Sequence, residues 1–473
     1  MTKYVLLGIL IIIILFFFFN RGFAYYDEGF ILHAAQRVLQ GEFPYKDFDL
    51  IYTPGTVYLT AAAFKIFGES ILAGRILSLT VSLLACYLVY KICFRSTKNY
   101  FGSFFAVLIY LAWGPTHINF PWPSMFALTT GMAAIWFVPG FFTVGLMTFV
   151  TFLMKQNFGA AVLLSIVIWL LLTGKVKKIS NLFRLVMGFS AGAFIFLIYL
   201  LITGSLSPFL NNFYFYTIQR FLLENVASTP FPSELKAIFY FIPAVVSLSV
   251  LILVRKKANI LILPIFTLLF YLFGIRPTTD FVHLTTLMSL TGLPLGLLIT
   301  NKKSYFPGVI ISLLLIILGF QTAIFKNYYR WDSPIYKQNS FSDQTKAKIF
   351  VDQKFNKIIP EVIGEIKKNT TKNDFIFIFP NAPMFYFLSE RKNPTRFINL
   401  PLGLHSLNQE REVVDNLKNK QVNLILTNEP PVNSSYPVIS DYVLKNYLIK
   451  KQFFEFTLWE KVEVGKRSEV LNK

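Results

Sequence analysis

The chain has 473 residues, of which 54% are hydrophobic and 17% are aromatic, and its mean hydropathy is +0.54. This composition excludes a soluble globular domain, because apolar stretches of about 20 residues, the length that crosses roughly 30 Å of hydrocarbon, recur along the chain. The formal net charge of +20 does not indicate nucleic-acid binding, since the basic residues gather in short loops between apolar runs, as orientation signals do.

The first apolar run, residues 4–19, is interpreted as a retained helix and not as a cleaved signal peptide, because Arg21 and bulky aromatic residues follow it where a small-residue cleavage site would stand. The two cysteines, Cys86 and Cys93, fall in or near one later run and are predicted to be small core residues. They argue against a disulfide scaffold or a thiolate metal site.

Hydropathy predicts a polytopic α-helical membrane protein with about eleven spans. Their approximate positions are 4–20, 71–92, 101–114, 124–138, 140–154, 158–173, 184–203, 237–254, 259–275, 284–300 and 305–323. The fourth and fifth spans are separated only by Pro139 and Gly140, so they could equally form one broken hairpin.

The basic loops predict the orientation of these spans, because lysine and arginine accumulate on the cytoplasmic side. Threading eleven spans from a cytoplasmic N-terminus places every basic cluster on that side: Lys3; Lys91, Arg95 and Lys98; Lys175, Lys177 and Lys178; Arg255, Lys256 and Lys257; Lys302 and Lys303. The opposite, outer side then holds the first loop (21–70), the turn 115–123, the loop 204–236 and everything after about residue 324.

The tail, residues 324–473, is predicted to be a small α/β domain outside the membrane, separate from the transmembrane domain 1–323. Its apolar runs are short and it is rich in charge. "DFIFIF" (374–379) and "QVNLILTN" (421–428) indicate buried strands, whereas "APMFYFLSE" (382–390) and "LNQEREVVDNLKNK" (407–420) indicate helices.

Acidic residues are rare before the tail, and six of the nine lie in the single loop 21–70. Two of them, Asp27 and Glu28, are adjacent and lie beside the first span, where a carboxylate is costly unless it is used. The stretch that follows, "DEGFILHAAQRVLQGEFPY", has helical periodicity, which predicts an amphipathic helix on the membrane surface with the acid pair at its N-terminus. The helix dipole favours acids there, so a structural role for Asp27 stays open at this point.

These motifs resemble a known family. The first helix, "DEG", the surface helix and "PYKDFDLIYTPGTVYL" before the second span are similar to the GT-C superfamily of membrane glycosyltransferases. The most similar branch contains the protein O-mannosyltransferases and the lipid A aminoarabinose transferases, with many uncharacterised bacterial relatives. The resemblance covers the order of spans over residues 1–323, and "YFLSERKNPTRF" in the tail is similar to the bacterial relatives as well.

The resemblance implies a sugar donor linked to polyprenyl phosphate and presented at the outer leaflet of the cytoplasmic membrane. The acceptor would be a hydroxyl of a lipid, a glycan or a protein, and polyprenyl phosphate would be the leaving group. Asp27 would be the general base, and Glu28 would tune it or bind the acceptor. Such a transfer needs a base for the acceptor hydroxyl and positive charge for the departing phosphate. Because Asp27 and Glu28 are adjacent, each carboxylate hinders the ionisation of the other.

The sequence departs from the family pattern at the basic residue that would contact the donor phosphate. The aminoarabinose transferases carry a lysine just before the prolines of the first loop, where Tyr52 and Thr53 stand here. The sequence offers other contacts for the donor phosphate and sugar on the outer side: Lys46, Tyr52, Lys155 with Gln156 and Asn157 in "MKQNFG", and Arg276 with Asp280 and His283 in "FGIRPTTDFVHL". The alternatives are a snorkelling lysine, an interfacial arginine paired with Asp280, and a polar helix cap at His283.

No metal site is predicted, because one histidine and one aspartate beside an arginine are a poor ligand set. Some GT-C enzymes use a divalent ion through acidic motifs, so metal dependence stays open, and no cofactor is assigned.

Two other classes of protein are alternatives to a glycosyltransferase. A transporter or flippase of a lipid-linked saccharide would carry polar residues at mid-bilayer in broken helices, whereas here ionisable residues are nearly absent from the span centres and gather at one surface. A membrane-anchored binding protein would leave the acidic first loop without a purpose. The pattern therefore favours an interfacial enzyme.

Overall fold

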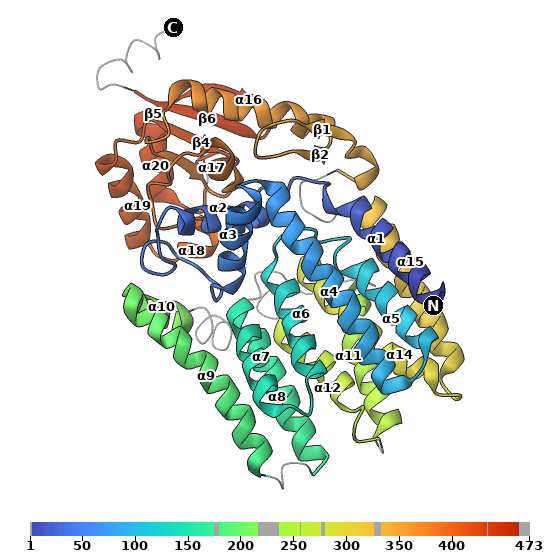
Figure 1. The fold of residues 1–473 in the computed structure, drawn as a ribbon. Helices are drawn as coiled ribbons and strands as arrows, with labels where there is room; N and C mark the ends of the chain where they lie inside the picture. The colour runs from blue at the N-terminus through green and yellow to red at the C-terminus, as the bar shows by residue number, and fades with distance from the viewer. Residues whose placement is uncertain are drawn as a thin grey trace.

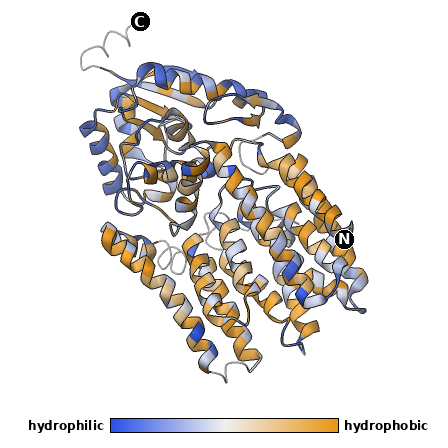
Figure 2. Ribbon diagram, viewed as in Figure 1, coloured by the Kyte–Doolittle hydropathy of each residue, from blue (hydrophilic) through white to orange (hydrophobic). Residues whose placement is uncertain are grey.

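The computed structural model describes residues 2–174, 179–215, 236–255, 257–275, 280–325, 333–432 and 434–462. A bundle of apolar helices makes up most of the chain, and an α/β part formed by the last third covers one end of the bundle (Figure 1). Hydrophobic residues dominate the bundle helices, whereas the α/β part carries much of the hydrophilic surface (Figure 2).

Each of the eleven predicted spans coincides with a helix, and the tenth is divided into two. The bundle helices are α1 (Thr2–Phe19), α4 (Ile71–Thr97), α5 (Tyr100–Trp113), α6 (Pro123–Trp136), α7 (Phe141–Met154), α8 (Gln156–Leu172), α9 (Ile179–Thr203), α11 (Lys236–Val254), α12 (Ile262–Gly274), α13 (Phe281–Leu290), α14 (Gly292–Thr300) and α15 (Tyr305–Phe325).

Four stretches of the described chain are long and apolar enough to cross a membrane: α4, α9, the pair α13–α14 and α15. The other apolar helices are shorter, so their crossing of the membrane stays a prediction. Lys155 is the single residue between α7 and α8. The two helices therefore meet almost directly, and their junction places Lys155 at the end of the bundle that the α/β part covers.

The first loop contains two helices, α2 (Asp27–Leu39) and α3 (Gly55–Phe67). Helix α2 was predicted, but its expected position on the membrane surface is wrong, because ten of its thirteen residues are buried. Its polar side chains contact the α/β part and the rest of the first loop: Arg37 donates to the carbonyl oxygens of Thr395 in the α/β part (3.0 Å) and Asp47 in the loop (3.0 Å). Helix α3 was not predicted, because its apolar residues read as the approach to the second span.

The α/β part is built on a mixed four-stranded sheet in the order β3-β4-β6-β5. Strands β3 (Ile376–Phe379) and β4 (Leu424–Thr427) are parallel, and β6 (Phe456–Lys461) pairs antiparallel with both β4 and β5 (Tyr447–Phe453). The helices are α16 (Gln353–Asn369), α17 (Met384–Ser389), α18 (Leu400–Gly403), α19 (Leu407–Asn419) and α20 (Pro437–Asn446). The predicted strands at 374–379 and 421–428 and the helices at 382–390 and 407–420 are confirmed.

Four smaller elements complete the described fold: α10 (Leu206–Phe213) after α9, and, between α15 and α16, the short helix η3 (Ile335–Lys337) and a hairpin of β1 (Ser340–Ser342) and β2 (Ile349–Val351). The hairpin reaches the first loop, where the backbone of Phe350 exchanges hydrogen bonds with Asn20 and Gly22 at 2.9 Å each.

The first loop and the α/β part share one hydrophobic core. Phe23 and Ile31 of the loop belong to the same buried cluster as Phe355, Ile359 and Phe385. Ion pairs surround this core, with Arg396 on Asp49 (2.8 Å) and Lys346 on Glu69 (2.7 Å). The α/β part is thus packed firmly on the loop that carries Asp27 and Glu28.

Candidate functional site

The three residues of the "DEG" motif lie in three different environments. Asp27 is the first residue of α2 and is partly exposed, whereas Glu28 is fully buried. Gly29 lies against the start of α17, where an added Cβ would come within 2.4 Å of the backbone nitrogen of Met384. Glycine at this position therefore permits the close approach of the α/β part to the N-terminus of α2.

Glu28 is held by Arg75, near the start of α4. Arg75 donates from Nε to Oε1 (2.8 Å) and from Nη2 to Oε2 (2.7 Å) of Glu28, and it also donates to the backbone carbonyls of Arg21 (3.0 Å) and Gly22 (2.8 Å). Burial raises the pKa of the Glu28 carboxyl, and the Arg75 guanidinium acts in the opposite direction. Both oxygens of Glu28 are occupied, so this acid fastens the first loop to the bundle.

Lys155 is a buried cation on which the charges of Asp27 and Asp280 act. Its side chain is only 6% exposed, and its Nζ donates to Ser124 Oγ at 2.8 Å. The ammonium also lies over the rings of Tyr52 (5.1 Å) and Phe158 (5.2 Å). Burial lowers the pKa of Lys155 to about 8, and the negative charges of Asp280 and Asp27 oppose this shift. Residues from the first loop, the α7–α8 junction and the start of α13 therefore meet in one region.

The two residues after Lys155 fix the surrounding backbone. Gln156 accepts from the backbone N–H of Thr53 (3.2 Å) and donates to the carbonyl of Ile51 (3.1 Å), while Thr53 Oγ1 donates to the carbonyl of Phe152 (2.5 Å). Asn157 donates from Nδ2 to the carbonyl of Phe273 (2.7 Å), near the end of α12. Gln156 thereby ties the Tyr52–Thr53 segment to Lys155, and Asn157 ties the same junction to α12.

Asp280 and His283 form a local pair at the start of α13. Asp280 Oδ1 accepts from the backbone N–H of His283 (2.8 Å), which caps the helix, and lies 2.8 Å from His283 Nδ1. The His283 ring packs edge-on against the ring of Trp122, 6.1 Å between centroids. The third member of the predicted "RxxxDxxH" set, Arg276, lies outside the described residues.

Lys46 lies apart from this region. Its side chain is exposed, it lies over the ring of Phe43 (5.7 Å), and its Nζ is next to Gly204 at the α9–α10 junction. Within the described ranges, no contact joins Lys46 to Asp27 or Lys155.

Sequence reasoning missed three residues that shape the region: Arg75, Trp122 and Ser124. Arg75 had a usable signal, because an arginine inside a predicted span needs a buried partner. Trp122 and Ser124 carried no such signal, because their importance comes from contacts with α8 and α13, which are distant in sequence.

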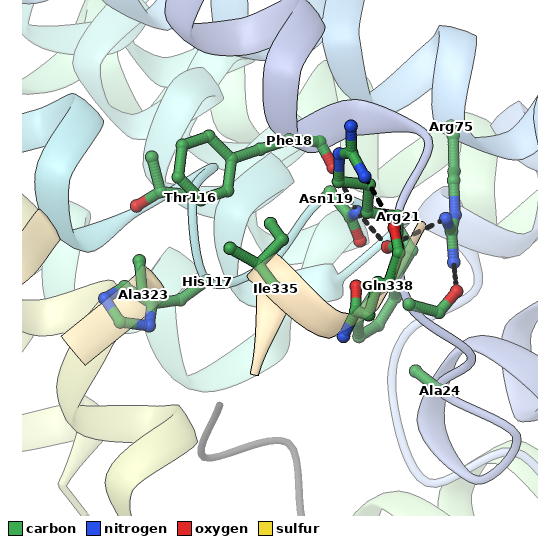
Figure 3. A pocket seen from close by; sticks show the side chains of 12 residues that line it. Phe18, Arg21, Ala24, Arg75, Thr116, His117, Asn119, Ala323, Ile335 and Gln338 are labelled. Atoms are coloured by element: carbon green, nitrogen blue, oxygen red, sulfur yellow. Dashed lines mark hydrogen bonds between the residues drawn. The ribbon is translucent and has the colours of Figure 1, made fainter. Parts of the chain in front are cut away.

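A small cavity of about 30 Å³ lies beside Arg75, between the ends of α1 and α15 (Figure 3). Its polar side chains already have partners: Arg21 Nη1 donates to the Gln338 carbonyl (2.5 Å), and Asn119 Nδ2 donates to the Phe18 carbonyl (2.7 Å). None of the predicted site residues lines it. In the part of the chain that the structure describes, no three histidine, cysteine or acidic side chains gather as a metal site.

Comparison with known proteins yields matches among solved structures. No family model matches the chain, and no curated protein matches it. ArnT from Cupriavidus metallidurans, solved with bound undecaprenyl phosphate, aligns with a TM-score of 0.63 at 14% identity over 98% of both chains. The apo state of the same protein aligns with a TM-score of 0.60 at 13% identity, again over 98% of both chains.

An oligosaccharyltransferase from Archaeoglobus fulgidus, solved with zinc and sulfate, aligns with a TM-score of 0.50 at 11% identity. The alignment covers 90% of this chain and 68% of the archaeal one. Identities this low show the fold alone. The chain therefore has an ArnT-like fold, in agreement with the fold that the sequence resemblance implied.

Proposed function

We propose that this protein is a glycosyltransferase that moves a sugar from a polyprenyl-phosphate donor to an acceptor hydroxyl at the outer face of the cytoplasmic membrane. One observation carries the proposal: the charges of Asp27 and Lys155, an acid suited to act as base and a buried cation, act on each other under the α/β part. The fold supports it, because the ArnT structure with the same architecture holds undecaprenyl phosphate.

The reaction needs one proton transfer and one bond exchange. Asp27 accepts the proton of the acceptor hydroxyl, and the hydroxyl oxygen forms a bond to the anomeric carbon of the sugar. The bond between that carbon and the phosphate oxygen breaks, and its electron pair leaves with polyprenyl phosphate. The donor is already activated by its phosphate, so no nucleotide is consumed.

Lys155 supplies positive charge to the departing phosphate. The first loop lacks the lysine found in the aminoarabinose transferases, and Lys155 occupies the neighbourhood of that position because its ammonium lies over Tyr52. A charge in a buried site acts more strongly on a phosphate than a charge in water. With a pKa of about 8, Lys155 is mostly protonated at neutral pH.

Three further predicted residues support this pair. Gln156 and Asn157 hold the backbone around Lys155, and Asp280, whose charge acts on Lys155, orients His283. We assign Asp280 and His283 to the sugar side of the donor, and Arg276 remains a second candidate for the phosphate. The acceptor, a lipid, a glycan or a protein, would reach Asp27 beneath the α/β part.

The test is turnover of defined donors. Purified protein in liposomes is incubated with a panel of polyprenyl-phosphate sugars and a membrane extract that supplies acceptors, and release of polyprenyl phosphate is followed. We expect release from at least one donor by the wild type and none above background by Asp27→Asn. Passage of a lipid-linked saccharide across the bilayer, without release from any donor, would contradict the proposal and support the transporter.

A further inference from the structure

The N-terminus of α6 faces the same region as Lys155 and lacks a cap. The helix begins at Pro123, and no side chain accepts a hydrogen bond from its first turn. By contrast, α13 nearby is capped by Asp280. Pro123 has no N–H, and the N–H groups of Met125 and Phe126 donate to the Trp122 carbonyl at 3.0 and 3.2 Å. The first turn therefore offers an anion the backbone N–H of Ser124 and the positive end of the helix dipole.

Trp122, the residue before this helix, carries a buried donor without a partner. Its side chain is 5% exposed, and among the described residues nothing accepts a hydrogen bond from Nε1. Two other buried tryptophans are satisfied: Trp113 and Trp169 donate to the carbonyls of Leu315 and Ala258, both at 2.8 Å. Because buried N–H groups are almost always paired, the indole of Trp122 marks a position that a ligand would fill.

Lys155 adds further donors at the same helix end. Its Nζ bonds to Ser124, the second residue of α6, and in the described structure this is its one hydrogen bond. An ammonium has three N–H groups, so two remain for a ligand. Trp122, Lys155 and the start of α6 thus offer donors and positive charge, which an oxyanion requires. The negative charges of Asp27 and Asp280 act on the same lysine.

We propose that the phosphate of the lipid-linked donor binds at the N-terminus of α6, with its oxygens accepting from Trp122 Nε1 and from Lys155 Nζ. The inference rests on the proposed function and deepens it: it locates the phosphate and adds Trp122 as a binding residue.

The first test observes the Trp122 N–H directly. The chain has six tryptophans, so the ¹⁵N-indole spectrum of the full-length protein in detergent has few resonances, which Trp→Phe variants assign. Adding undecaprenyl phosphate should move the Trp122 indole proton downfield while the Trp169 resonance stays. Undecaprenol, which has the same tail without the phosphate, should leave both unchanged. An equal shift with the alcohol would overturn the assignment.

The second test separates binding from stability. Trp122→Phe removes the unpaired N–H, so its affinity for undecaprenyl phosphate should fall about tenfold while its melting temperature stays equal or rises. Trp169→Phe, the matched control, removes a paired N–H and should lower the melting temperature without changing the affinity. A Trp122→Phe protein that binds as tightly as the wild type would refute the role of Trp122.

The two proposals fail in different ways. If the wild type does not bind undecaprenyl phosphate at all, the proposed function is contradicted. If the wild type binds it but the Trp122 resonance does not move, only the location of the phosphate is wrong. If Trp122→Phe weakens binding of the glycosylated donor but not of undecaprenyl phosphate, the indole serves the sugar and the phosphate assignment is likewise overturned.

Discussion

Asp27 and Glu28, which are adjacent in the first loop, each interact with a buried cation. The two pairs differ in how many of their polar atoms take part in hydrogen bonds. In the pair of Glu28 and Arg75, both carboxylate oxygens accept hydrogen bonds from the guanidinium. The other guanidinium N–H groups donate to backbone carbonyls. The charge of Asp27 acts on Lys155, whose one hydrogen bond within the described part of the chain goes to Ser124. Burial is similar for Glu28 and Lys155, so burial alone does not distinguish a structural charge from a functional one.

The comparison shows that unused hydrogen-bond donors distinguish a functional charge from a structural one better than burial does. A buried ion pair with all its polar atoms engaged contributes mainly to the register between elements, and a ligand could enter only by breaking it. A buried cation with spare donors is costly in the free protein and is relieved by an anion. This contrast can be tested by mutating each pair in turn, and the following predictions run from the largest expected effect to the smallest.

Asp27→Asn should lower kcat for transfer by about 10²–10⁴-fold, because it removes the proposed general base. Donor binding should stay within about threefold of the wild type, since the phosphate contacts are intact. Single-turnover release of polyprenyl phosphate measures the first quantity, and equilibrium binding of undecaprenyl phosphate measures the second. A loss confined to donor affinity would remove Asp27 from the base position.

Glu28→Gln should lower stability by about 3–5 kcal/mol, because it leaves the Arg75 charge buried without its counter-charge. Thermal unfolding in detergent is the measurement. The double variant Glu28→Gln with Arg75→Gln should lose less than the sum of the single variants, since neither charge is then left alone. Additive losses would show that the two side chains do not act as a pair.

Lys155→Met should weaken donor binding by about 10–100-fold, the worth of a hydrogen bond to a charged group. The affinity for the donor should also depend on pH. The pKa of Lys155 is lowered to about 8, so the ammonium loses its proton, and the site loses affinity for the donor, as the pH rises above about 8. Lys155→Arg should keep its charge and its affinity to higher pH. An unchanged alkaline limb in the arginine variant would assign the titration to another group.

Gln156→Ala should have the smallest effect, a fall of about 3–10-fold in kcat/KM, because it removes two modest hydrogen bonds to the backbone of the 51–53 segment. The loss should appear in KM, since the segment carries Tyr52 against Lys155. Gln409→Ala, which alters only the exposed start of α19, is the matched control. Equal effects of the two substitutions would deny Gln156 a positioning role.

The sequence predicted the helices and the acid pair because both depend on local pattern. Apolar runs of sufficient length, such as 71–92, and the periodicity after Asp27 follow from residues that are neighbours along the chain. The α/β tail was recognisable for the same reason, since β3 and β4 are continuous apolar runs.

What the sequence could not predict depends on contacts between distant segments. The burial of α2 requires the α/β part, and the division of roles between Asp27 and Glu28 requires Arg75, 47 residues beyond Glu28. Lys46 and Lys155 were both candidates from the sequence, and the fold brings Lys155 within electrostatic reach of Asp27. Trp122 gave no signal in the sequence, because its ring contact with His283 and its indole N–H without a partner among the described residues are properties of the folded chain.

The most direct test of the account is a side-by-side measurement of single-turnover polyprenyl phosphate release by Asp27→Asn and Glu28→Gln, each corrected for its folded fraction. The account predicts that Asp27→Asn loses at least about 100-fold in rate, whereas folded Glu28→Gln stays within about fivefold of the wild type, because its defect lies in stability. Equal losses of rate per folded molecule, or a larger loss in Glu28→Gln, would contradict the division of roles between these two adjacent acids.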